Sequence, residues 1–158
     1  AFALAERLTA RAITVTTAES CTGGMVAAEL TRVPGISALL SEAVVCYSNA
    51  AKTLRLGVDP ALIEAHGAVS EEVAEAMVRG AAERSGAQLA VAVTGVAGPG
   101  GGTAEKPVGL VCFAVCLGGR LSVCTRRWPD AGRDRVRQWA TSKALALMLE
   151  AVGQVSGD

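Results

Sequence analysis

The chain has 158 residues, with fifteen basic side chains against fifteen acidic ones; 51% of its residues are hydrophobic and only 3% are aromatic. A chain of this length fits one domain and can bury a substantial core, which alanine and valine fill through many small contacts. The balanced charge argues against a polyanion or a membrane surface as partner. No apolar run approaches the ~18 residues of a membrane span. We therefore expect no nucleic acid and no membrane among its partners.

The five cysteines are odd in number, lie mostly in apolar runs and show no CxxC spacing. Buried, reduced thiols in a cytoplasmic protein explain this usage better than disulfides or zinc. Residues 2–11 predict an amphipathic helix rather than a signal peptide. The missing initiator methionine suggests a processed or excised piece of a longer protein. We expect a cytoplasmic location, with no metal and no cofactor.

Helical and strand patterns alternate through the first half of the chain. In order, they predict a helix over 2–11, a buried strand over 13–18, a helix that ends near residue 32, a short strand within 42–48, and helices over 49–56 and 60–66. Asn49 is the expected N-cap of the third helix, which Gly57 closes. Asp59 and Pro60 supply the N-cap and the first residue of the next helix.

The second half of the chain contains its longest apolar runs. It predicts a long helix from Ser70 to Ser85, strands over 89–93 and 108–117, a hairpin at Gly118-Gly119, a returning strand over 121–128 and a last helix after Asp130. Continuous apolar strands are typical of a sheet covered on both faces. Helices that alternate with strands early, and a hairpin late, predict one α/β domain over 1–158, a three-layer α/β/α sandwich with a mixed sheet.

Ser20 lies in Thr17-Ala18-Glu19-Ser20-Cys21-Thr22-Gly23-Gly24, where a β-branched strand gives way to a helix. Free N–H groups and the positive end of the helix dipole can stabilise a phosphate or the oxyanion of acyl transfer. The alternative is an ordinary helix N-cap with glycines for the turn. Cys21 competes with Ser20 as nucleophile by position, but no well-placed histidine would form the ion pair that a cysteine needs. We expect Cys21 to contribute its backbone N–H instead.

A serine nucleophile needs a base, because a free hydroxyl is a poor nucleophile near neutral pH. His66, the only histidine, ends a predicted helix beside Gly67, which indicates a structural role and disfavours a Ser-His-Asp triad. Lys52 follows a predicted strand end, and an amine in a partly dry pocket loses its charge near neutral pH. Lys52 could accept the Ser20 proton, with Tyr47 relaying it or orienting the amine. A solvated surface lysine is the alternative.

A glycine-rich loop over 94–107 follows a buried strand. It is long for a connector, and its backbone N–H groups suit a phosphate, to which Lys106 would add charge. It has neither the Walker spacing nor a GxGxxG that opens a helix, so neither an ATPase nor a dinucleotide site is supported. A flexible surface loop is the alternative. Arg133 and Arg137 share a face of the last helix near its N-terminus, where they either bind phosphate or form ordinary salt bridges.

Taken together, these segments resemble the CinA C-terminal domain family, the nicotinamide-nucleotide amidohydrolases. The matching segments are residues 18–24, Tyr47-Ser48-Asn49 with Lys52, residues 67–73 and residues 94–109. The resemblance implies hydrolysis of the carboxamide of nicotinamide mononucleotide to nicotinic acid mononucleotide and ammonia, without a metal. It implies that Ser20 attacks the amide carbon, that Lys52 and Tyr47 handle the serine proton, and that backbone N–H groups hold the oxyanion. The residues implied for that oxyanion hole are Cys21, Thr22 and Gly23.

The resemblance also implies a substrate site and a partner. The substrate-binding residues would be Asn49, Thr94, Gly95, Gly98, Gly100, Gly101, Thr103, Lys106, Arg133 and Arg137. The expected ligand is a small-molecule pyridine nucleotide, and the expected assembly is a homodimer. The alternative function is a non-catalytic nucleotide-binding or partner-docking module of a competence/damage-inducible protein.

Overall fold

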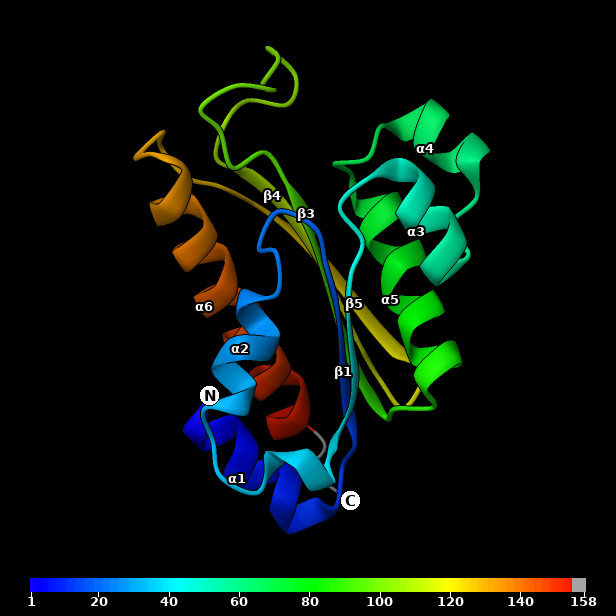
Figure 1. The fold of residues 1–158 in the computed structure, drawn as a ribbon, viewed down its shortest axis with the longest axis vertical. Helices are drawn as coiled ribbons and strands as arrows, with labels where there is room; N and C mark the ends of the chain where they lie inside the picture. Colours follow the sequence, from blue (N-terminus) through cyan, green and yellow to red (C-terminus); the bar gives the residue numbers. More distant parts are fainter. Residues whose placement is uncertain (155–158) are drawn as a thin grey trace.

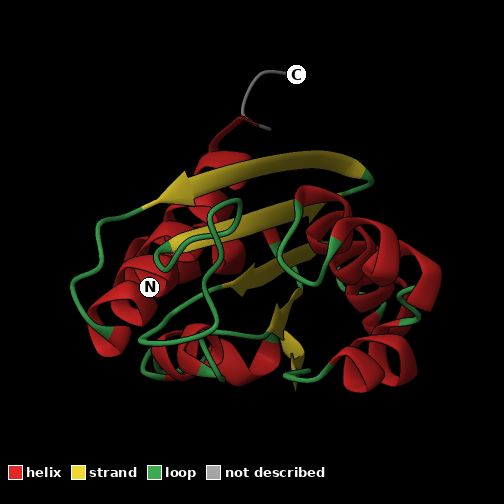
Figure 2. Ribbon diagram, turned by 90° about the horizontal axis from the view of Figure 1, so that it is seen from above, coloured by secondary structure: helices red, strands yellow, loops and turns green. Residues whose placement is uncertain are grey.

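Residues 1–154 are described by the structure, a computed structural model, and form three layers with a sheet in the middle (Figures 1 and 2). In this part of the chain the sheet has five strands in the order β2-β1-β3-β4-β5. Their bounds are Val15–Glu19 for β1, Leu40–Val45 for β2, Leu89–Gly95 for β3, Leu110–Leu117 for β4 and Arg120–Arg127 for β5. β1 pairs in parallel with β2 and β3, whereas β3, β4 and β5 run antiparallel. The predicted mixed sheet is confirmed.

Helices cover both faces of this sheet. Their bounds are Phe2–Arg11 for α1, Met25–Thr31 for α2, Asn49–Leu56 for α3, Pro60–His66 for α4, Glu71–Ser85 for α5 and Arg133–Gln154 for α6, with a short 3-10 helix at Ile36–Ala38. Figure 1 shows α1, α2 and α6 on one face and α3, α4 and α5 on the other. The predicted α/β/α sandwich is therefore confirmed. The predicted domain extends to residue 158, and its last four residues lie outside the described part.

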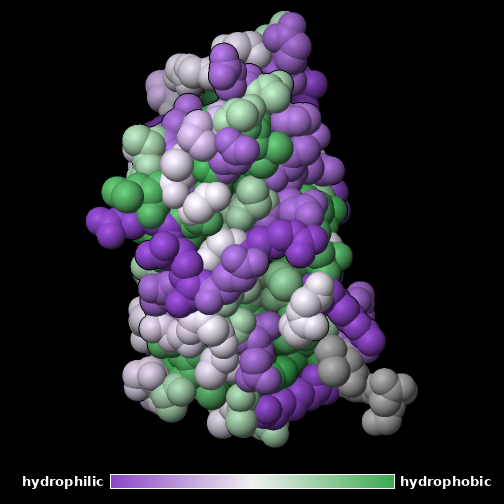
Figure 3. Space-filling view, turned by 90° about the vertical axis from the view of Figure 1, so that its right-hand side faces the viewer, coloured by the Kyte–Doolittle hydropathy of each residue, from purple (hydrophilic) through white to green (hydrophobic). Residues whose placement is uncertain are grey.

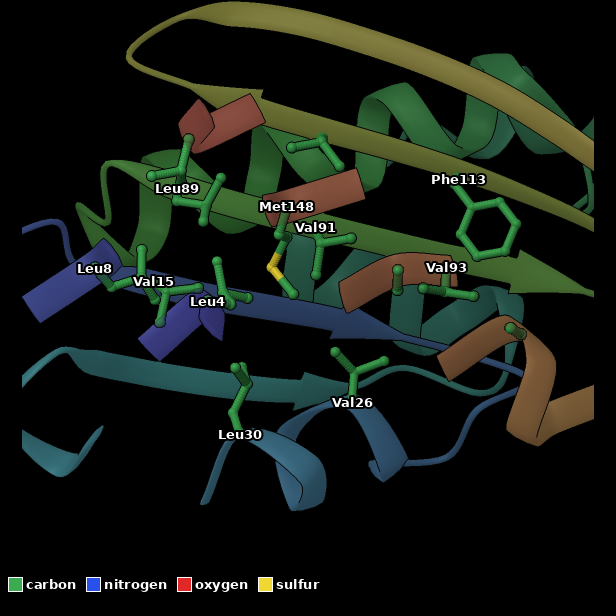
Figure 4. Close-up of a cluster of buried hydrophobic side chains, with 14 of the residues drawn as sticks. Leu4, Leu8, Val15, Val26, Leu30, Leu89, Val91, Val93, Phe113 and Met148 are labelled. Atoms are coloured by element: carbon green, nitrogen blue, oxygen red, sulfur yellow. The ribbon is translucent and has the colours of Figure 1, made fainter. Parts of the chain in front are cut away.

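The central strand β3 divides its side chains between two cores. Leu89, Val91 and Val93 join the core beneath α1, α2 and α6 (Figure 4), whereas Ala90 and Ala92 join the core beneath α5. Successive side chains of a strand point to opposite faces, so this alternation follows from the pleat. Both cores are continuous with the same sheet, and burial on both sides explains the unbroken apolar run in the sequence.

Side-chain caps begin the helices of the α5 face. Ser48 accepts a hydrogen bond from Ala51 N–H at 3.1 Å, so Ser48, and not the predicted Asn49, is the N-cap of α3. Ser48 has the extended backbone of a cap, while Asn49 is already helical. Asp59 caps α4 as predicted, with Pro60 as the first helical residue.

The carboxyl ends of β1, β2 and β3 lie together at one end of the sheet, because these three strands are parallel. Glu19 at the end of β1 lies in register between Val45 of β2 and Val93 of β3. Pairing continues one step further: Ser20 N–H donates to Val93 O at 2.9 Å, and Cys46 N–H donates to Glu19 O at 2.8 Å. Ligands of α/β proteins usually bind where parallel strands end. This end of the sheet is therefore the first place to look for a site.

Candidate active site

Ser20 and Lys52 meet at this end of the sheet. Lys52 Nζ lies 3.1 Å from Ser20 Oγ, although the residues are 32 positions apart in the chain. Ser20 directly follows β1, and Lys52 lies in the first turn of α3, just after β2. The exposed fraction is 1% for Lys52 and 7% for Ser20. The structure thus brings together the two residues that the sequence predicts as nucleophile and base.

Two main-chain carbonyls hold the Lys52 amine. Nζ donates to Cys46 O at 3.0 Å and to Tyr47 O at 3.2 Å. Burial lowers the pKa of Lys52 below its ordinary value of 10.5, and the nearby thiols of Cys46 and Cys21 oppose that shift. A buried amine with a lowered pKa is able to act as a general base closer to neutral pH.

Cys21 is a poor candidate nucleophile in this setting. Its side chain is buried, and burial raises the pKa of the thiol to about 12. The thiolate is the reactive form of cysteine, and it is scarce at any pH well below that value. The geometry therefore favours the hydroxyl of Ser20.

Glu19 is a functional residue that sequence reasoning missed. Its fully buried carboxylate accepts hydrogen bonds from three backbone N–H groups, those of Gly24 at 2.9 Å, Val26 at 3.1 Å and Ala27 at 2.9 Å. Glu19 therefore caps α2, which begins only at Met25. It accepts from the free N–H groups at the N-terminus of this helix, which we expected to lie near Ser20 and stabilise an anion. The available signal was a carboxylate inside a run of buried strand residues, since such a charge needs hydrogen-bond partners.

The predicted oxyanion residues have different environments. Cys21 lines the cleft next to Ser20, and within residues 1–154 its N–H donates to no backbone carbonyl but interacts with its own thiol. Gly23 N–H is already used, because it donates to Ser20 O at 3.0 Å. Thr22 is fully buried away from the cleft, and its hydroxyl has no hydrogen-bond partner in the described part of the chain. Of the three predicted donors, Gly23 N–H is thus already used within the turn, and Cys21 is the one that lines the cleft.

Ser20 and Lys52 open on a cleft of about 260 Å³. Predicted site residues that line it are Ser20, Cys21, Tyr47, Lys52, Thr94, Gly95, Gly98, Gly100, Gly101 and Arg133. Thr94 is fixed in its wall, since its hydroxyl donates to Ala68 O at 2.7 Å. The glycine-rich loop after β3 therefore forms part of the cleft.

Arg133 and Tyr47 meet at the rim of the cleft. Arg133 Nη2 donates to the Tyr47 hydroxyl, and Arg133 Nη1 donates to Gly98 O at 2.8 Å. The phenol thus faces Arg133 and not the amine. Tyr47 contacts Lys52 through its main-chain carbonyl, so it orients the amine by its backbone, and the predicted proton relay through its side chain is not what the geometry shows.

Three predicted substrate-binding residues, Asn49, Thr103 and Lys106, do not line the cleft. Asn49 lines a separate apolar groove between α3 and α4, on the side of the molecule that Figure 3 shows, where apolar patches interrupt a polar surface. Lys106 N–H donates to the Thr103 hydroxyl at 3.0 Å, which closes a turn of the glycine-rich loop. The Lys106 amine donates to His66 O at the end of α4. His66 itself has the structural place predicted for it, with Nδ1 3.3 Å from Glu72.

Arg137 is the fourth predicted substrate-binding residue that does not line the cleft. Its Nε donates to Cys21 O at 3.2 Å and its Nη2 to Thr22 O at 3.1 Å, and it is absent from the lining of the cleft. A guanidinium presents its donors in a rigid fork that suits two neighbouring acceptors. Arg137 Nη1 also lies 3.6 Å from Asp134 Oδ1, which is the ordinary salt bridge that the sequence left open. Arg137 therefore holds the turn after Ser20, and its contact with substrate stays a prediction.

Within residues 1–154, no three side chains of the His, Cys, Asp and Glu types gather as a set of metal ligands. No helix in the same range has both the length and the apolar character required to cross a membrane.

The fold and the site define an α/β protein with a buried serine–lysine pair at the carboxyl ends of its parallel strands. A sequence model of the CinA C-terminal domain matches residues 1–152. The chain belongs to the CinA C-terminal domain family, and the resemblance found in its sequence is confirmed.

Relatives agree with this assignment. The chain is 55% identical over 149 residues to a CinA-like protein of Mycolicibacterium vanbaalenii, covering 94% of this chain and 35% of that protein. It is 53% identical over 155 residues to a CinA-like protein of Mycobacterium tuberculosis, covering 98% of this chain and 35% of that protein. The chain thus spans about a third of the length of these curated relatives.

Solved structures share the fold. The competence/damage inducible protein CihA from Agrobacterium tumefaciens superposes with a TM-score of 0.90 at 45% identity, covering 95% of this chain and 93% of that chain. A CinA superfamily protein from Klebsiella pneumoniae superposes with a TM-score of 0.92 at 35% identity, covering 96% and 94% respectively. Both support the same α/β/α architecture.

Proposed function

We propose that the chain hydrolyses the carboxamide of nicotinamide mononucleotide to nicotinic acid mononucleotide and ammonia. The observation that carries this proposal is the 3.1 Å approach of the Lys52 amine to the Ser20 hydroxyl in a nearly dry setting. A hydroxyl with an adjacent base is the arrangement that acyl transfer requires. The family resemblance supplies the substrate, and no cofactor is needed for this chemistry.

The contacts of Lys52 support a direct proton transfer. A neutral amine has two hydrogens and one lone pair, and the carbonyls of Cys46 and Tyr47 accept both hydrogens. The lone pair then faces Ser20, whose O–H donates to it. As Oγ attacks the amide carbon, the proton passes to Nζ.

Lys52 returns this proton when the intermediate collapses. The C–N bond breaks, the leaving nitrogen takes the proton from the Lys52 ammonium, and ammonia departs from an ester on Ser20. Water then attacks this ester with Lys52 as base, and its collapse returns a proton to Ser20 Oγ. Nicotinic acid mononucleotide is released, and both side chains regain their starting protonation.

The wall of the cleft supplies the remaining interactions. Cys21 N–H, adjacent to the nucleophile, is the donor placed to stabilise the oxyanion, and losing one such donor typically costs about 10²–10³ in rate. Arg133 and the glycines at positions 98, 100 and 101 offer charge and backbone groups to the phosphate of the nucleotide.

An ammonia-release assay on nicotinamide mononucleotide tests the proposal. We expect Ser20→Ala to abolish release and Lys52→Ala to reduce it nearly to zero, because they remove the nucleophile and its base. His66→Ala, outside the cleft, is the matched control and should keep the wild-type rate. Full activity of Ser20→Ala would overturn the mechanism.

A second candidate is a nucleotide-binding or partner-docking module without catalysis. It is favoured by the names of the solved relatives, which refer to competence and damage induction and not to an enzyme. Calorimetric binding of the nucleotide without turnover over hours would favour it. Steady ammonia release would exclude it as the primary role.

We also propose that the protein forms a homodimer and resides in the cytoplasm. The five cysteines are all free, which agrees with a reducing compartment. Light scattering of the purified chain tests the dimer, and a monomer across the working concentration range would contradict it.

A further inference from the structure

We propose that Arg137 is a positioning residue that orients the oxyanion donor, Cys21 N–H, through the backbone of the turn after Ser20. This inference rests on the proposed function, because it assigns a role in stabilising the charge that amide hydrolysis creates. Arg137 does not itself line the cleft, and its hydrogen bond to the lining residue Cys21 is made to a main-chain oxygen.

Two peptide planes connect Arg137 to that donor. In a trans peptide the C=O and the following N–H point in opposite directions. Arg137 holds the Thr22 C=O at 3.1 Å, which fixes the Gly23 N–H on the other side of the same plane. Gly23 N–H in turn holds the Ser20 C=O at 3.0 Å. The Ser20 C=O shares its plane with Cys21 N–H, which therefore points to the opposite side of that plane and donates to no backbone carbonyl in the described part of the chain.

The second contact of Arg137 stops the turn from rotating. Its Nε donates to the Cys21 C=O at 3.2 Å. The Cys21–Thr22 peptide plane, which lies between the Ser20–Cys21 and Thr22–Gly23 planes, is therefore also fixed. Hydrogen bonds in such a chain polarise one another, and a cation at its start strengthens the last donor. The carboxylate of Asp134, one turn earlier in α6, lies 3.6 Å from Arg137 Nη1 and helps to hold the guanidinium in place.

Arg137→Lys tests whether the forked guanidinium is needed to hold the two carbonyls. Arg137→Lys keeps the charge, but a single ammonium cannot hold both carbonyls in the geometry of a guanidinium. We expect kcat for ammonia release to fall by about tenfold or more while KM stays unchanged, because the donor acts on the oxyanion and not on bound substrate. Arg135→Ala is the matched control, since Arg135 is an exposed arginine two positions away that stacks over Trp139.

The same variant distinguishes positioning from phosphate binding. Nicotinamide riboside has the same amide without the phosphate. If Arg137 positions the donor, kcat/KM falls by the same factor for the riboside and the mononucleotide. A loss confined to the mononucleotide, or a rise in KM with kcat unchanged, would overturn the inference. Guanidinium ion should restore part of kcat to Arg137→Ala and have no effect on Arg135→Ala.

A readout independent of turnover separates this inference from the proposed function. The Cys21 amide resonance should shift in Arg137→Lys but not in Arg135→Ala, because only the first substitution changes the orientation of this peptide plane. A wild-type protein without ammonia release would overturn the proposed function, and an unchanged Cys21 amide would overturn the positioning role. Unfolding midpoints of both variants show whether any loss reflects global destabilisation.

Discussion

Lys52 is the largest side chain that the fold buries completely. Its partners are the Ser20 hydroxyl and two carbonyls, none of which carries a charge. A buried ammonium without a carboxylate is costly, whereas a neutral amine with the same contacts is not. The residue is therefore suited to lose its proton, which is the property that a base for Ser20 must have.

The pH dependence of the rate follows from this burial. Because the pKa of Lys52 is lowered and the neutral amine is the active form, kcat/KM should rise with pH along a limb whose midpoint lies below 10.5. Initial rates of ammonia release across this range measure the limb. Lys52→Arg, which stays protonated, should be inactive throughout. A midpoint at or above 10.5, or a rate that falls as the amine deprotonates, would contradict the assignment.

At the scale of elements, the N-terminus of α2 depends on one carboxylate. Glu19→Gln keeps the shape but replaces one oxygen with an NH₂ group that faces backbone donors. We expect the free energy of unfolding to fall by about 3 kcal/mol, because a buried charged acceptor is lost and donors remain unsatisfied. Urea denaturation measures the change. Glu29→Gln, which breaks only a surface pair with Arg32, should change it by less than about 1 kcal/mol.

The contact between α3 and α5 sets the position of the catalytic amine. A Cβ placed at Gly80 of α5 would lie 1.8 Å from Leu56 O at the end of α3, so any side chain there must push α3 away. We expect Gly80→Ala to reduce stability by about 1–3 kcal/mol and to lower the amidase rate, because Lys52 lies on the displaced helix. The exposed Glu83→Ala on α5 is the control. A normal rate together with normal stability would show that α3 does not move.

The long elements were predictable from the sequence for simple reasons. The unbroken apolar runs of β3 and β4 reflect burial on both faces, and the glycines at 118 and 119 mark the hairpin between β4 and β5. Caps were less certain because Ser48 and Asn49 are both good capping residues, and only the backbone distinguishes them. Local chemistry therefore predicts that a helix exists better than where it begins.

At the scale of the whole molecule, the site unites segments that are distant in the chain. Ser20 and Lys52 were predictable because each follows a strand and parallel strands end together. The contact of Arg137 with the turn was not predictable, because its partner is a main-chain oxygen 116 positions away and no side-chain pattern indicates a backbone acceptor. The contact of Lys106 with His66 O was not predictable for the same reason. Sequence reasoning thus finds reactive groups more readily than the groups that hold them in place.

The proton balance of unfolding links this amine to the pH of the solution. Between the lowered pKa of Lys52 and its ordinary value of 10.5, the folded chain binds fewer protons at this residue than the unfolded chain does. Lys52 therefore takes up a proton on unfolding and its contribution to the free energy of unfolding rises with pH, whereas the cysteines whose pKa values burial raises above 9.0 release protons on unfolding and act in the opposite direction. Scanning calorimetry in buffers of different ionisation heat should therefore show that Lys52→Met takes up fewer protons on unfolding than the wild-type chain. Folding therefore already favours the neutral form of Lys52, which is the form that accepts the Ser20 proton in the proposed reaction.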